Sequence, residues 1–151
     1  MKRHAAHWTR SLQWALVVSV GVAFGVMALT IMGGTRADTS YITLGELRSN
    51  AAELREIAHN ASAERLTATF TRAQGSQLER RITSLHDDLD KARRERPSND
   101  VAAALSLAGR LLTASRALVE RAESSSAARE LEPEFETILA ALIPLEQRAR
   151  P

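Results

Sequence analysis

The sequence predicts an all-α protein with one N-terminal transmembrane helix, followed by an antiparallel helical bundle of three or four helices. Residues 12–33 carry no charge. Beyond them, apolar residues recur at spacings of three and four, the period of one helix face, and no stretch alternates as a strand would. The expected order is a basic cytoplasmic tip (1–11), a transmembrane signal anchor (12–34), a connector (35–42) and the bundle (43–150).

The uncharged run has the length and the flanks of a membrane span. Its 22 residues make about 33 Å of helix, against a hydrocarbon core of roughly 30 Å. Trp8 and Trp14 flank its start, where aromatic rings favour the headgroup region. Basic residues are more frequent before the run than just after it, which predicts a cytoplasmic N-terminus. Eighteen of the twenty basic residues are arginines, typical of a GC-rich bacterial genome, so we expect a bacterial inner membrane.

An alternative is a cleaved export signal, because Thr35 and Ala37 approximate the small residues before a cleavage site. A signal h-region usually has about 7 to 15 residues, and this run is longer. The length therefore favours an uncleaved anchor. The alternative is a secreted helical protein released by cleavage after Ala37.

Small residues recur along the run at intervals of four. Gly21 and Gly25 form a GxxxG motif, and a second row follows the same spacing: Ala15, Ser19 and Ala23. In lipid, such rows let two helices approach closely and gain dispersion contacts. They predict a homodimer contact in the membrane. The alternative is that small residues are simply common in membrane helices.

Charge and composition exclude several classes of function. The net charge is +2, but Lys2, Arg3 and Arg10 precede the run, and seventeen basic and eighteen acidic residues follow it. A nucleic-acid surface needs a clustered basic excess with aromatic side chains, so nucleic acid is not an expected partner. The absence of cysteine excludes disulfides and thiolate metal sites.

Two helices are predicted between the connector and Pro97. Thr43 and Glu46 have capping-box form and predict the start of the first. Its apolar face is Leu44, Leu47, Ala51, Leu54, Ala58 and Ala61, continued by Leu66, Phe70 and Ala73. Gly75 predicts a stop, and Ser76 with Glu79 predicts a second capping box. The alternative is a helix that continues through Gly75, at a cost of only about 1 kcal/mol. The next face is Leu78, Ile82, Leu85, Leu89 and Ala92.

The last helices follow Pro97. Ser98 or Asn99 predicts an N-cap, with Asp100 in the first turn. The third face is Val101, Ala104, Ala108, Leu111, Leu118 and Ala122, widened by Leu105, Leu112 and Val119. We expect Pro133 in the first turn of the last helix and a kink or an end at Pro144. The fourth face is Leu131, Phe135, Ile138, Leu139, Leu142 and Leu145.

No chemical motif stands out. His86 and the aspartates at 87, 88 and 90 lack any recognised metal-ligand spacing. The pairs Arg80-Arg81 and Arg93-Arg94 alternate with acidic residues, which favours ion pairing within a solvated helix over an anion site. No nucleophile elbow, phosphate loop or paired-acid motif is present. We expect no catalysis, no metal and no cofactor.

Two stretches carry a resemblance: LGELRSNAAELREIAH after the connector and ELEPEFETILAALIPLE in the last helix. With the basic tip and the single span, they resemble the membrane-anchored four-helix-bundle sensory domains of bacterial chemoreceptors. The resemblance implies ligand sensing, a second span and cytoplasmic signalling modules. This sequence contains neither a second span nor such modules before Pro151, and no ligand-binding residue is carried over.

The leading hypothesis is a membrane-anchored interaction module in the lipid bilayer, which binds a second copy or another membrane or envelope protein. An alternative is a small-molecule sensor, with Ser115 and Gln77 as polar groups directed into the bundle.

Overall fold

The computed structural model describes residues 41–150, and this part of the chain is helical apart from short loops. A first helical segment covers residues 41–62. Three helices follow: α2 (Ala68–Glu95), α3 (Asn99–Glu120) and α4 (Ser125–Ala149). No strand occurs between residues 41 and 150. The predicted all-α class is confirmed.

The predicted tip, the span at residues 12–34 with its small-residue rows, and the connector up to residue 40 lie outside the described residues. Within them, α3 alone is long and apolar enough to cross a membrane. Leu111 and Leu118 of α3 are nevertheless buried in the core that α3 shares with the other helices. The candidate span in the described part is therefore mid-chain and is not the predicted N-terminal one.

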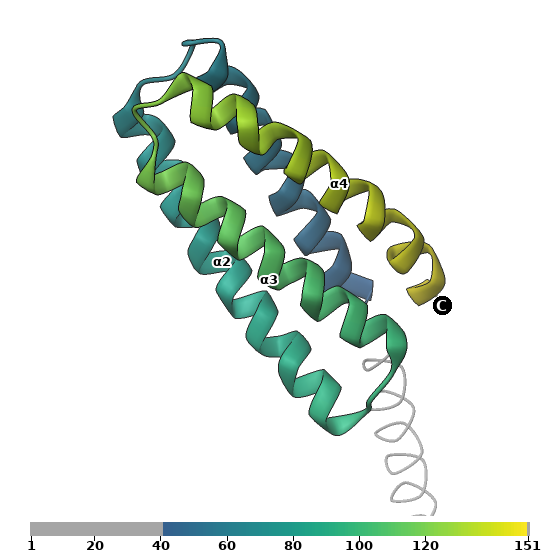
Figure 1. Ribbon diagram of the computed structural model, residues 1–151. Helices are drawn as coiled ribbons and strands as arrows, with labels where there is room; N and C mark the ends of the chain where they lie inside the picture. The colour runs from purple at the N-terminus through teal and green to yellow at the C-terminus, as the bar shows by residue number, and fades with distance from the viewer. Residues whose placement is uncertain (1–40, 151) are drawn as a thin grey trace, which may run out of the picture. The chain divides into compact units, whose positions relative to one another are not determined.

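Neighbouring helical segments run antiparallel (Figure 1). Cross-helix contacts show this directly, because residue numbers rise along one helix while they fall along its neighbour. The first segment meets α4 through the pairs 48–146 and 59–132. Helix α2 meets α3 through 72–123 and 79–116, and α3 meets α4 through 100–148 and 110–134.

The core lies where the predicted apolar faces meet. All six positions predicted for the first segment before residue 62 are buried. In the later helices the buried members of the predicted faces are Leu78, Ile82, Leu85, Leu89, Ala104, Ala108, Leu111, Leu112, Leu118, Phe135, Ile138, Leu142 and Leu145. The heptad-like spacing therefore located most of the core.

The break between the first two helices lies at residues 63–67, earlier than predicted. Glu64 has a positive φ of 59°. The Thr67 side chain then caps α2 by accepting a hydrogen bond from the Phe70 backbone N–H at 3.2 Å. This new helix start turns Phe70 out of the predicted face, and 46% of it is exposed.

The predicted stop at Gly75 is wrong, and so is the second capping box, because α2 runs unbroken through Ser76 and Glu79. Gly75 is buried, and a Cβ on it would lie 2.7 Å from Cγ2 of Val119 in α3. A mid-helix glycine costs only about 1 kcal/mol relative to alanine. The glycine is therefore explained by close approach of two helices and not by a turn.

The predicted start at Thr43 and Glu46 is also wrong, since both lie inside helix that already includes residues 41 and 42. Residues 41 and 42, which end the predicted connector, are therefore part of the first helix. Ser98 is the N-cap of α3, and its side chain accepts a hydrogen bond from the Val101 N–H at 3.2 Å.

Helix α4 starts earlier than predicted. Ser124 caps it by accepting from the Ala127 N–H at 3.2 Å, so Pro133 lies well inside the helix. Ala127 and Ala128 are buried, and this packing extends the helix across a stretch with a weak apolar pattern. Pro144 does not end α4, which continues to Ala149.

Candidate functional site

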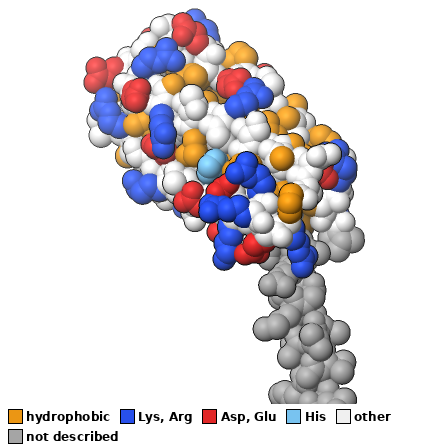
Figure 2. Space-filling view, turned by 60° about the horizontal axis from the view of Figure 1, so that its bottom comes forward, with side chains coloured by type: hydrophobic (Ala, Val, Ile, Leu, Met, Phe, Trp, Pro, Cys, Tyr) orange, Lys and Arg blue, Asp and Glu red, His pale blue; other side chains and the backbone are white. Residues whose placement is uncertain are grey.

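Charged side chains of both signs are interspersed over the face in view in Figure 2, with hydrophobic side chains in small groups between them. Many of these charges meet across the line of contact between two neighbouring helices, which we call a seam. Three seams in the described part carry ion pairs that link their two helices. The fourth seam, between the first segment and α2, has no such ion pair among the described residues.

The α3/α4 seam is linked near one end and near its middle. Nε and Nη2 of Arg110 each donate to a carboxylate oxygen of Glu134 at 3.0 Å. Arg148 donates to Oδ1 of Asp100 from Nε at 3.1 Å and from Nη2 at 2.8 Å. Two-pronged arginine–carboxylate contacts of this kind fix orientation as well as contributing energy.

The α2/α3 seam combines ion pairs with close packing. Arg116 donates to Glu79 at 2.8 Å, and Arg72 contacts Glu123 at 3.3 Å. Thr71, one turn before Gly75, is fully buried, and its hydroxyl is the one buried side-chain polar atom of the described residues without a hydrogen-bond partner. Sequence reasoning missed this residue, because nothing in the local pattern marks a threonine as buried.

The seam between the first segment and α4 holds a buried carboxylate. Glu146 is only 5% exposed, and Arg48 lies 3.0 Å from its Oε2. Arg150 lies 3.9 Å from the other oxygen, and its guanidinium is 5.9 Å from the ring centroid of Tyr41. These contacts join the C-terminal turn of α4 to the first helix.

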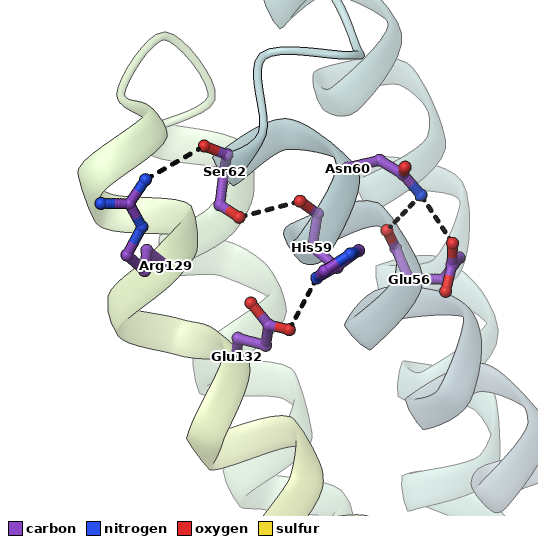
Figure 3. Close-up of polar contacts among 6 residues, drawn as sticks. All are labelled: Glu56, His59, Asn60, Ser62, Arg129 and Glu132. Carbon is purple, nitrogen blue, oxygen red and sulfur yellow. Dashed lines mark hydrogen bonds and ion pairs between the residues drawn. The ribbon is translucent and has the colours of Figure 1, made fainter.

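The opposite end of that seam is shown in Figure 3. His59 Nδ1 lies 2.9 Å from Oε1 of Glu132, and Arg129 donates to the Ser62 carbonyl at 3.4 Å. The Ser62 hydroxyl donates to the His59 carbonyl, and Asn60 donates to the carbonyl one turn earlier. These hydrogen bonds satisfy backbone carbonyls near the end of the first helix. The side chains that make them therefore have a structural role.

The seam between the first segment and α2 contains a hollow of about 460 Å³. We call it the polar hollow, and its lining residues are Glu46, Ser49, Asn50, Arg81, Ser84, Leu85 and Asp88. The side chains of Glu46, Arg81 and Asp88 form no ion pair with any residue between 41 and 150. Charges of opposite sign therefore surround an open space without neutralising one another.

Asn50 lies deepest among the polar groups of the polar hollow. Only 7% of it is exposed, and its Nδ2 donates to the Glu46 backbone carbonyl at 2.9 Å. Its Oδ1 has no partner among residues 41–150, so an acceptor is available there. Leu85, also 7% exposed, supplies the apolar part of the wall.

A second hollow of about 430 Å³ lies between α3 and α4. Its lining includes Arg110 and Glu134, which pair with each other, and is otherwise mostly small or apolar. Because its two charged side chains already neutralise each other, this hollow has no unpaired charge for a ligand to bind, unlike the polar hollow.

The residues predicted for ligand sensing lie elsewhere. Ser115 is fully buried, and its hydroxyl donates to the Gly75 carbonyl at 3.5 Å. Gln77 is exposed. Neither lines either hollow.

The acidic stretch of α2 forms no cluster of three or more metal-ligating side chains in the described part. Asp90 instead pairs with Arg93 at 2.9 Å and with Arg94. The hydrogen bond from Arg94 is the largest influence on Asp90 and lowers its pKa, and desolvation opposes that shift. The predicted ion pairing within the helix is confirmed for Arg93 and Arg94. Arg81, for which it was also predicted, has no ion-pair partner among the described residues.

No protein-family model, curated protein or solved structure matches this chain.

Proposed function

We propose that this protein is a single-pass, membrane-anchored helical interaction module that binds a second copy of itself or another membrane or envelope protein. The observation that carries the proposal is the uncharged run at residues 12–33, which directly precedes a unit whose helices are linked by ion pairs. The N-terminus is cytoplasmic, and the helical unit lies outside the inner membrane.

The helical unit supplies a rigid, antiparallel four-helix bundle at the end of a short tether. Support comes from the two-pronged pairs of Arg110 and Arg148 and from the buried Glu146, because such contacts oppose sliding of one helix along another. A rigid unit close to a bilayer presents the same surface to every partner.

Large hydrophobic side chains remain exposed on three of the helical segments. Ile42 is 55% exposed, Phe70 46% and Ile143 43%. On the face shown in Figure 2, charged side chains separate the hydrophobic side chains into small groups. A protein contact of mixed polar and apolar character fits such a surface.

Self-association is the first form of the proposal to test, because the GxxxG row offers a contact in the membrane. Full-length protein in detergent is expected to sediment as a dimer. Replacing Gly21 and Gly25 with isoleucine should shift it toward monomer, since the β-branched side chains hold the helices apart. The matched control replaces Val22 and Val26 with isoleucine, which changes side chains one position along.

A monomer at every protein concentration, together with no crosslinked partner in cells, would overturn the proposal. Dimers unaffected by the glycine substitutions would remove the membrane contact and leave the helical unit as the binding surface.

The anchor itself is tested by the mass of the mature protein. We expect Met1 or the adjacent residue at the N-terminus of membrane-bound protein. A mature chain that begins at Asp38 would instead establish cleavage after Ala37 and a secreted protein.

A further inference from the structure

We propose that the polar hollow binds a small zwitterion with one carboxylate and two cationic groups, as in a basic α-amino acid. The starting observation is the contrast among the seams. Three have their arginines and carboxylates paired across the helices, whereas the charges around the polar hollow have no ion-pair partner in the described part.

The charges of the lining define the charges of the ligand. Glu46 and Asp88 contribute two carboxylates, and Arg81 contributes one guanidinium. A neutralising ligand therefore carries two positive groups and one negative group. A dicarboxylate leaves Glu46 and Asp88 unpaired and repelled, and a simple diamine leaves Arg81 without a partner.

The geometry of α2 suits an elongated molecule. Arg81 and Asp88 are seven residues apart on one face, a separation of about 10.5 Å along the axis. Arg81 offers the planar fork that binds a carboxylate with two parallel hydrogen bonds. Asp88, two turns away, accepts from a cationic group at the far end of the ligand, and Leu85 lies between them beside its methylene chain.

The first helical segment completes the site from the other side. Glu46 accepts from the second cationic group, and the free Oδ1 of Asn50 accepts another of its N–H bonds. The hydroxyls of Ser49 and Ser84 adapt to either sign because each both donates and accepts. The volume of about 460 Å³ falls within the range of roughly 300–1,000 Å³ found for small-molecule pockets.

This inference concerns a seam and a ligand that the proposed interaction function does not use. A failed ligand test leaves the dimer measurement intact, and a monomeric protein is still able to bind the amino acid.

The test is isothermal titration of full-length protein in detergent with L-arginine and L-lysine. Both are expected to bind, and L-glutamate and putrescine at least tenfold more weakly. Arg81→Gln and Asp88→Asn should each weaken binding at least tenfold, because each leaves one charged end of the ligand without a partner.

Matched controls sit one residue away on the same helix. Arg80→Gln and Asp87→Asn remove the same charges from positions that do not line the polar hollow, and binding should stay within twofold. All four substituted positions are exposed, so circular dichroism is expected to show unchanged helix content.

The proposal is overturned if neither amino acid binds, if the control substitutions weaken binding as much as the hollow substitutions, or if glutamate binds as well as arginine. Putrescine binding that equals lysine binding and ignores Arg81→Gln would also overturn it, because the carboxylate would then play no part.

Discussion

Gly75 of α2 and Val119 of α3 approach so closely that a Cβ on the glycine would lie 2.7 Å from Cγ2 of the valine. Both residues lie inside helices, and the contact joins segments far apart in sequence. The absence of a side chain at this one position allows the two helices to pack against each other there.

Gly75→Ala is expected to destabilise the protein by up to about 2 kcal/mol. Alanine raises helix propensity by about 1 kcal/mol, but overpacking of this kind typically costs about 1–3 kcal/mol. Urea unfolding followed by circular dichroism measures the difference. Gly109→Ala is the matched control, because a Cβ there meets no atom within 4 Å and should stabilise α3. Equal stabilisation by both substitutions would show that the contact with Val119 is not limiting.

Thr71→Val should stabilise the protein by about 1 kcal/mol. The hydroxyl is buried without a partner, and valine replaces it with a methyl group of similar shape, which removes the desolvation cost. Thermal unfolding is the measurement. Thr69→Val, at an exposed position two residues earlier, is expected to change the stability by less than about 0.5 kcal/mol. A loss of stability on Thr71→Val would mean that the hydroxyl has a partner in solution.

Arg48→Ala should cost about 1–3 kcal/mol, because it leaves the buried carboxylate of Glu146 with only the more distant Arg150. Arg110→Ala breaks a pair whose carboxylate is 38% exposed, and its cost should stay below about 1 kcal/mol. Chemical unfolding of the two variants gives the comparison. A double-mutant cycle with Glu146→Ala separates the pair from the general effect of losing the arginine.

Asp90 should titrate below its ordinary value of 3.8 in the folded protein, because Arg94 and Arg93 stabilise its ionised form. The lowered pKa means that its stabilising contribution is present above about pH 3.8 and is lost as the pH falls through the folded-state pKa. Carboxyl resonances followed by NMR give the pKa directly. Arg94→Gln should move it back toward 3.8, and an unchanged titration in that variant would contradict the assigned cause.

The apolar spacing was informative because it reflects the helix period, which depends only on local geometry. Leu47, Leu54 and Ile82 are buried where a period of 3.6 places them. Helix ends were harder to predict. The break lies at 63–67, with Thr67 as the N-cap of α2, whereas Gly75 packs against Val119, a contact between distant residues that no local pattern contains.

The polar hollow was also beyond sequence reasoning. Arg81 looks like one more member of a solvated, paired arginine cluster, and Arg93 and Arg94 do pair within their helix. Only the placement of α2 beside the first segment brings Arg81 and Asp88 to the same space as Glu46. Asn50 gives no signal in sequence, since its burial is set by its neighbours in space.

The sequence by itself determined the all-α class, most of the buried face of each helix and a cap at Ser98 or Asn99, because these follow from local backbone geometry and the burial of apolar side chains. Tertiary structure alone decided that Gly75 is a contact and not a turn, that Pro133 lies inside a helix, and which charges are paired. The physical reason is that close approach and charge pairing depend on which helices are neighbours, and that is a property of the whole fold.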